Sequence, residues 1–167
     1  MNPPSQRRLA LLSLHRRCAA VIFAALLTPA WAAAPEAAAP SSAGLAAFKV
    51  VGDGIPDRLG AAGDAARGRA LIIAREAANC VLCHAVPDPG VHFSGNVGPS
   101  LEGVASRMTQ AQLRLRIVDS LRLDPRTIMP SYYRVDGLDR VATVYRGKPI
   151  LDAAQVEDIV TYLGTLR

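Results

Sequence analysis

Residues 80–84 of this chain read Cys80-Val81-Leu82-Cys83-His84, and this stretch decides the fold. Two thiols one helical turn apart can each form a thioether bond with one of the two vinyl groups of a haem. The histidine that follows them then lies where it can bind the iron. The spacing is a mechanical requirement of covalent attachment. It predicts one haem c bound through Cys80 and Cys83, with His84 as an axial ligand of the iron.

Three other interpretations of this cysteine pair are open. A disulfide between Cys80 and Cys83 would close a very small loop, which is typical of redox motifs rather than of structural bonds. A zinc site would need a second pair of ligands, for which only His84 and His92 are available. A thioredoxin-like site would follow a strand, whereas the residues before Cys80 have helical periodicity. Covalent haem is favoured over all three.

The first 34 residues have the organisation of a secretory signal peptide. Four arginines precede an uncharged run at 18–27, and small residues then lead to Ala34. The run has about half of the roughly 20 residues that a membrane span needs, which disfavours a retained anchor. We expect cleavage near Ala32 or Ala34, a mature chain without a membrane span, and a periplasmic location. The pair Arg7-Arg8 leaves twin-arginine export open.

Removal of this segment changes the charge of the chain. The 167 residues contain 19 basic and 14 acidic side chains, a formal charge of +5, but residues 1–34 hold four of the basic ones and no acidic one. The mature chain therefore has a charge of +1 and no dense Lys/Arg stripe, so we expect no nucleic-acid partner. Its composition is that of one globular domain rather than of a disordered protein.

The folded domain is predicted at residues 63–167, after a flexible leader at about 35–47 and an irregular extension at 48–62. Gly, Pro, Ala and Ser dominate this leader and extension. Asp64 can cap a first helix, expected to run from Ala65 to Ala78 and to lead directly to Cys80. A short extended segment at 141–145, followed by a turn, is expected further along.

Two more helices begin at capping boxes. Thr109 and Gln112 start a helix that has Leu113, Ile117 and Leu121 on one face and that cannot continue through Pro125. Asp152 and Gln155 start the last helix. Its apolar stripe runs to the C-terminus and predicts core packing. The stripe consists of Val156, Ile159, Val160, Leu163 and Leu166.

Met129 is the residue we favour as the sixth ligand of the iron. Pro130 disfavours helical geometry at the residue before it, so Met129 is expected on an extended loop that can reach across a haem. Met108 lies beside a helix cap, and His92 lies eight residues after His84 in a Pro/Gly-rich loop. Both are weaker candidates, and an ordinary core methionine is the alternative for Met129.

These features together resemble class I cytochromes c over residues 63–167. The matching motifs are the helix that ends in C-x-x-C-H, Gly98-Pro99-Ser100-Leu101, Met129-Pro130 and Tyr162-Leu163. The resemblance implies an all-α fold whose helices wrap around one covalent haem. It also implies that the Pro99 carbonyl accepts a hydrogen bond from the free ring nitrogen of His84. Finally, it implies that Gly68 lets the first helix cross the last near Tyr162.

Four longer stretches resemble the SoxX branch of that family, at residues 95–101, 111–119, 128–133 and 145–151. This resemblance implies a periplasmic heterodimer with a SoxA-like cytochrome subunit. The SoxAX complex, an L-cysteine S-thiosulfotransferase, joins thiosulfate oxidatively to a cysteine of the carrier protein SoxYZ. The branch resemblance further implies that the present chain takes the electrons at its haem and passes them to a small soluble cytochrome c.

The cysteine count limits the chemistry of this chain independently. With Cys18 removed and both Cys80 and Cys83 bonded to haem, no thiol is left to attack sulfur. We therefore expect electron acceptance here and the sulfur chemistry on the partner, and we name no catalytic residue. A free-standing periplasmic electron shuttle and a haem peroxidase with an open sixth position are the alternatives.

Some side chains have two interpretations. Phe93, Tyr132 and Tyr133 belong either to the haem pocket or partner surface or to ordinary core packing. The arginines from Arg107 to Arg126 are interpreted as a solvated helix face, with contact to haem propionates or to an acidic partner as the alternative.

Overall fold

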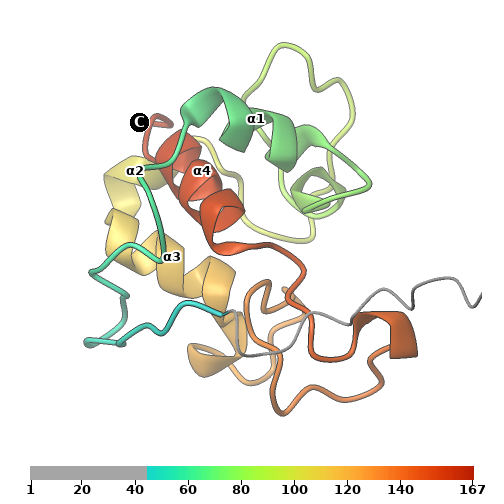
Figure 1. Cartoon of the computed structure of the whole chain (residues 1–167). Coiled ribbons are helices and arrows are strands. Elements are labelled where there is room, and N and C mark those ends of the chain that lie inside the picture. Colours follow the sequence, from blue (N-terminus) through green and yellow to red (C-terminus); the bar gives the residue numbers. More distant parts are fainter. Residues whose placement is uncertain (1–44) are drawn as a thin grey trace, which may run out of the picture. The chain divides into compact units, whose positions relative to one another are not determined.

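The computed structural model describes residues 45–167, so the expected signal peptide, Cys18 and the first part of the leader lie outside the described residues. Figure 1 shows α1 (Ala65–Ile73) above α4 (Ala153–Leu163) and α3 (Gln110–Val118) below it, and both pack against α4. The short helix α2 (Val104–Arg107) is a single turn that precedes α3. The all-α prediction is confirmed.

All three predicted N-caps are present. The Asp64 side chain accepts a hydrogen bond from the N–H of Arg67 (2.8 Å) at the start of α1. Thr109 and Gln112 form the capping box of α3, and Asp152 and Gln155 form that of α4. These side chains satisfy N–H groups that have no partner inside the helix. The starts of the helices were therefore predictable from local sequence.

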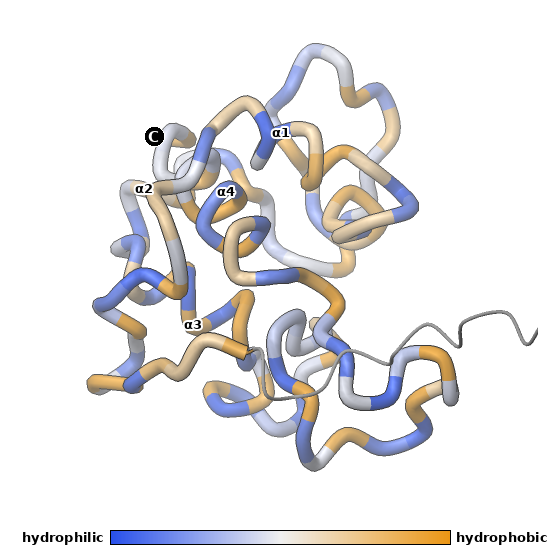
Figure 2. Tube along the Cα trace, in the orientation of Figure 1, coloured by the Kyte–Doolittle hydropathy of each residue, from blue (hydrophilic) through white to orange (hydrophobic). Residues whose placement is uncertain are grey.

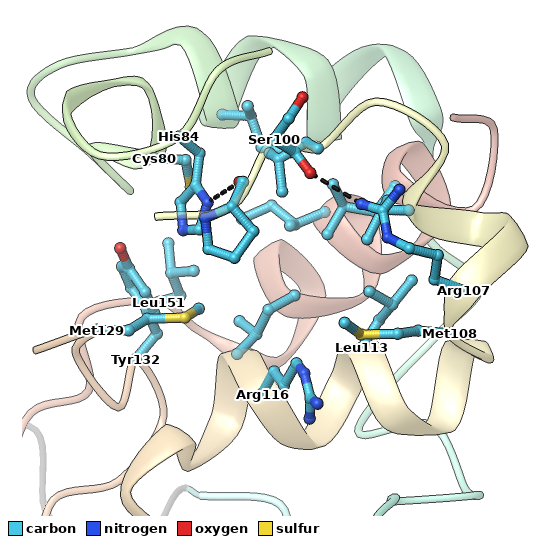
Figure 3. A pocket seen from close by; sticks show the side chains of 17 residues that line it. Cys80, His84, Ser100, Arg107, Met108, Leu113, Arg116, Met129, Tyr132 and Leu151 are labelled. Atoms are coloured by element: carbon cyan, nitrogen blue, oxygen red, sulfur yellow. Dashed lines mark hydrogen bonds between the residues drawn. The ribbon is translucent and has the colours of Figure 1, made fainter. Parts of the chain in front are cut away.

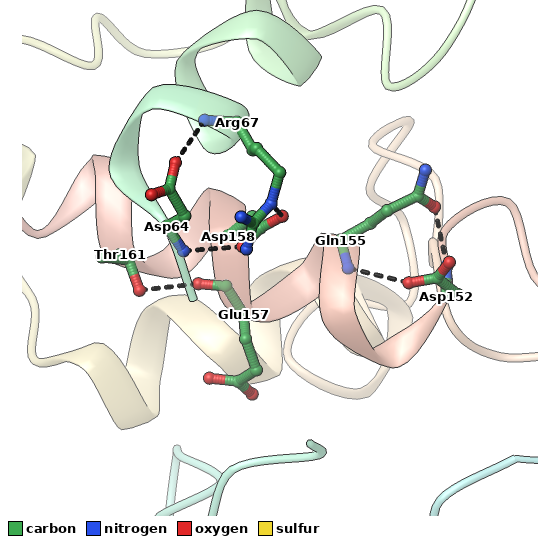
Figure 4. Close-up of polar contacts among 7 residues, drawn as sticks. All are labelled: Asp64, Arg67, Asp152, Gln155, Glu157, Asp158 and Thr161. Carbon is green, nitrogen blue, oxygen red and sulfur yellow. Dashed lines mark hydrogen bonds and ion pairs between the residues drawn. The ribbon is translucent and has the colours of Figure 1, made fainter. Parts of the chain in front are cut away.

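The crossing of α1 and α4 depends on Gly68, as the family resemblance implied. A Cβ atom at this position would collide with the carbonyl oxygen of Asp158 and would lie 2.9 Å from the Cβ of Tyr162. Arg67 forms two hydrogen bonds with the Asp158 carboxylate across the same crossing (Figure 4). These bonds lower the pKa of Asp158, so this ion pair stabilises the fold at neutral pH and its contribution is lost as the pH falls through the folded pKa.

The core lies between α1, α3 and α4. Figure 2 shows hydrophobic and hydrophilic residues alternating along α4. Four members of its apolar stripe are buried, namely Val156, Ile159, Val160 and Leu163. The fifth, Leu166, lies beyond the end of the helix and is partly buried. None of the helices in residues 45–167 has the length and apolar character needed to cross a bilayer.

A buried ion pair connects α3 and α4 to the segment that precedes α1. The side chains of Arg114 and Glu157 are 3% and 2% exposed and form two hydrogen bonds, of 2.7 and 2.8 Å. The guanidinium also donates to the carbonyl of Ile55, and the carboxylate accepts from the N–H of Leu59. Ile55 and Leu59 are themselves buried. The extension at 48–62 is therefore irregular in backbone yet packed against the helices.

The first helix ends at Ile73, so the prediction that it reaches Ala78 is wrong. Ala74 is extended, and Asn79 has a left-handed conformation (φ 57°), which an α-helix does not accommodate. The carbonyl of Ala78 accepts a hydrogen bond from the hydroxyl of Tyr132 (2.7 Å) instead of from a helical N–H. A contact distant in sequence thus holds the bend that follows the helix.

The second predicted helix also ends early, and Pro125 is not what ends it. α3 stops at Val118, where its last carbonyls accept hydrogen bonds from the N–H groups of Tyr132 and Tyr133. Leu121 then lies in the 3-10 helix η3 (Ser120–Arg122). The segment that follows Met129 thus packs against the C-terminal end of α3.

The prediction of an extended segment at 141–145 is wrong as well. The structure has the 3-10 helix η4 (Thr143–Tyr145) there, with Val144 and Tyr145 exposed. In the described part of the chain no strand lies beside this segment, and an unpaired strand is not stable in water. The expected turn follows it, with Gly147 at φ 69°.

Candidate functional site

The C-x-x-C-H stretch lies at the end of a tight bend after α1. Asn79, in its left-handed conformation, starts the 3-10 helix η2 (Cys80–Leu82), and the N–H of His84 donates to the carbonyl of Cys80 (2.9 Å). The two thiols are not joined to each other. Burial raises the pKa of the Cys80 thiol to about 11, so this thiol is neutral at physiological pH until it reacts.

Backbone groups at 98–99 hold the His84 imidazole. Its Nδ1 lies 2.6 Å from the carbonyl oxygen of Pro99, which is the contact implied by the family resemblance. Gly98 passes so close that a Cβ atom there would collide with the ring. With Nδ1 engaged by a carbonyl, Nε2 is the ring nitrogen available to a metal. The ring is thus oriented as an iron ligand requires.

A largely apolar cavity of about 890 Å³, including the space at its mouth, lies between these residues and α3 and α4. Cys80, His84 and Pro99 lie on one side of it, and Met129 faces them from another segment (Figure 3). A neighbouring cleft shares Cys80, His84 and Met129 with the cavity and also reaches Cys83. The predicted attachment and ligand residues are therefore brought together around one space.

The three candidates for the sixth ligand occupy different places. In Figure 3, Met129 lies across the cavity from His84, whereas Met108 lies at the other end, beside Arg107. Met129 also lines the cleft beside Cys83, and Met108 does not. His92 is exposed and lines neither space. This placement favours Met129, and its role as a ligand stays a prediction.

A comparison with family models decides the class of the protein. The model of the cytochrome c family, described as "Cytochrome c", matches residues 65–167, more than half of the chain. The chain belongs to the cytochrome c family. All of the predicted haem-binding residues of this cytochrome lie within the matched region.

Two known proteins are similar to this cytochrome. A cytochrome c-553-like protein from Synechocystis sp. is 41% identical over 56 residues, a match that spans 34% of this chain and 45% of that protein's length. The crystal structure of SoxXA from P. pantotrophus contains a chain that superposes with a TM-score of 0.66 at 35% identity. This second match covers 71% of the present chain and 93% of the other.

The residues present fit the covalent haem c that membership of the family implies. The surface of the cavity is largely apolar, and the thiols and the imidazole meet at its edge, as an apolar macrocycle attached through two thioethers requires. Arg107 and Arg116 also line it, and contact between these arginines and the haem propionates stays a prediction. Haem bound there supplies a one-electron Fe(III)/Fe(II) couple.

The alternatives for the cysteine pair lose support. Among residues 45–167 no three His, Cys, Asp or Glu side chains are grouped as a metal site, and the pair follows a helix and a bend rather than a strand.

The three aromatic residues that have two interpretations lie in different places. Tyr132 lines the cavity, Tyr133 is buried elsewhere and its hydroxyl accepts from the N–H of Ala46, and Phe93 is 83% exposed.

The arginines in α3 have separate roles. Arg114 is in the core ion pair, so the interpretation as a solvated face is wrong for this residue. Arg116 lines the cavity, which agrees with the alternative of contact with haem propionates. Periodicity is the signal for Arg116, because it lies three residues after Leu113, which lines the same cavity. Sequence reasoning missed the residues that support the Met129 loop, because serine and threonine carry no comparable pattern.

Proposed function

We propose that this cytochrome is the SoxX-type, electron-accepting subunit of a periplasmic SoxAX complex. The similarity to a chain of the SoxXA crystal structure carries the proposal, because it covers 93% of that chain at 35% identity. A haem motif alone is common to many cytochromes, whereas a likeness over a whole chain favours a shared role.

In the proposed site, Cys80 and Cys83 would hold the haem through thioether bonds, and His84 and Met129 would bind its iron. Pro99 fixes the tautomer and the orientation of His84 through the 2.6 Å contact. The apolar lining excludes water and so limits the reorganisation that accompanies a change of charge at the iron. The residues of this chain would thus keep the redox centre rigid and shielded from water.

The same ligand set makes this chain an electron acceptor rather than the place where sulfur bonds form. Two protein ligands leave no position on the iron for a substrate, and the thioether bonds leave no free thiol in the described residues. Joining thiosulfate to a SoxYZ cysteine is therefore assigned to the SoxA-like partner. The electrons pass through this chain to a small soluble cytochrome c.

Export to the periplasm is part of the same proposal. The signal-peptide pattern at residues 1–34 supports it, because such a segment directs a chain out of the cytoplasm. A nearly neutral mature chain also favours recognition of its partner by shape as much as by charge.

Co-purification from the native periplasm tests the proposed assembly. The tagged chain should elute together with a second c-type cytochrome, and the haem absorbance should exceed what one haem per copy of this chain accounts for. Periplasm from cells that lack the tagged chain is the control. Elution as an isolated, stable monomer that many donors reduce equally well would instead identify a free-standing electron shuttle.

A further inference from the structure

We propose that Ser120 is a positioning residue that holds Met129 on the wall of the cavity. This inference rests on the proposed role of Met129 as an axial ligand. The hydroxyl of Ser120 donates a hydrogen bond of 2.6 Å to the backbone carbonyl of Met129. Ser120 begins η3 and is separated from the end of α3 by Asp119 alone, so the bond ties the ligand loop to the helical part of the fold.

The other hydrogen bonds of the loop are formed mainly between residues of the loop itself. The N–H of Met129 donates to the Thr127 side chain (3.2 Å), and the N–H groups of Arg126 and Thr127 both donate to Asp124. Pro130 has no N–H to donate. Within residues 125–130, the bond from the Ser120 hydroxyl is therefore the one hydrogen bond to a helix among the described residues, while Asp124 and Ser131 at the two ends of the loop also contact Ser120.

Burial makes this bond hard to replace. Ser120 and the neighbouring Ser131 are each 5% exposed, whereas Ile128 beside Met129 is 77% exposed. The Ser131 hydroxyl is already engaged, because it donates to the Asp119 carboxylate (3.0 Å). Removal of the Ser120 hydroxyl thus leaves the Met129 carbonyl without a protein donor. Met129 is then held by the packing of its side chain against the core and by the bonds of Ser131 and Tyr132 that follow it, so the loop opens more easily.

The consequence for the iron is a shift between two states of the loop. In the closed state Met129 occupies its ligand position, and in the open state an added base can take that position without any transfer of electrons. The apparent affinity of such a base rises with the fraction of open loop. Loss of one net hydrogen bond corresponds to a rise of about three- to tenfold.

Imidazole titration of the oxidised, haem-loaded protein measures this fraction. Ser120→Ala should raise the imidazole association constant about three- to tenfold, and Ser120→Thr, which keeps a hydroxyl, should return it toward the wild-type value. Thr127→Val removes the other bond to the Met129 backbone and should act in the same direction, which provides a second reading if Ser120→Ala does not fold.

Thr161→Val and Met129→Ala are the two controls, and together they show which assignment fails. Thr161→Val removes a hydroxyl-to-carbonyl bond of 2.8 Å within α4, away from the loop, and should leave imidazole binding unchanged. An equal rise in Thr161→Val and Ser120→Ala would mean general loosening and would overturn the role of Ser120. An unchanged Ser120→Ala beside a strongly raised Met129→Ala would overturn it too, while Met129 keeps its assignment. If Met129→Ala itself binds imidazole like the wild type, Met129 is not the ligand, and both assignments are wrong.

Discussion

Met129→Ala should abolish the methionine-to-iron charge-transfer band of the oxidised protein and lower its reduction potential. A thioether ligand favours ferrous over ferric iron, and axial ligands set haem potentials over roughly 0.8 V, so we expect a fall on the order of 0.1 V or more. The visible spectrum and a redox titration measure the two effects. The haem itself should stay bound, because Cys80 and Cys83 hold it independently of Met129.

Met108→Ala is the matched control, since both methionines line the same cavity. It should keep the band and change the potential little, because Met108 lies beside Arg107 rather than across from His84 (Figure 3). The reverse pattern would move the ligand to Met108. Absence of the band from the wild-type protein, together with a changed haem spectrum in His92→Ala, would move the ligand to His92.

Glu157→Ala should remove a large part of the stability of the fold. It leaves the Arg114 guanidinium buried with its charge unpaired, and loss of one partner of a buried pair costs about 3–5 kcal/mol in the free energy of unfolding. The N–H of Leu59 loses its acceptor at the same time, so the extension at 48–62 should loosen from the helices. Denaturant unfolding of the haem-loaded protein measures the change.

Asp139→Ala gives the comparison for this prediction. Asp139 pairs with Arg140 on the surface, where the two side chains are 93% and 92% exposed, and removal of such a pair should cost less than about 1 kcal/mol. The double variant Arg114→Met, Glu157→Met should recover part of the loss, because no unpaired charge remains. A Glu157→Ala effect as small as that of Asp139→Ala would contradict the role of the ion pair.

The parts of the fold that were predictable depend on neighbouring residues. Asp64, Thr109 and Asp152 cap their helices through side chains that reach three positions ahead, so a short window of sequence contains the whole interaction. The end of α3 and the bend before Cys80 depend instead on Tyr132 and Tyr133, which come from further along the chain. No local pattern contains that information.

The residues of the site also differ in whether neighbouring sequence predicts their contacts. Cys80, Cys83 and His84 are adjacent, and the chemistry of haem attachment fixes their spacing. The contact between His84 and Pro99 came from the family resemblance, since nothing in the intervening residues specifies it. The buried pair of Arg114 and Glu157 and the bond from Ser120 to Met129 join segments whose proximity only the folded chain establishes.

Reduction of the haem by thiosulfate tests the proposed function most directly. The oxidised chain is mixed with thiosulfate alone, with thiosulfate and the SoxA-like partner, and with thiosulfate, partner and SoxYZ, while the absorbance of the reduced haem is followed. The SoxX assignment predicts reduction of this chain's haem only in the third mixture, where the sulfur chemistry supplies the electrons. Direct reduction of the lone chain by thiosulfate would contradict it.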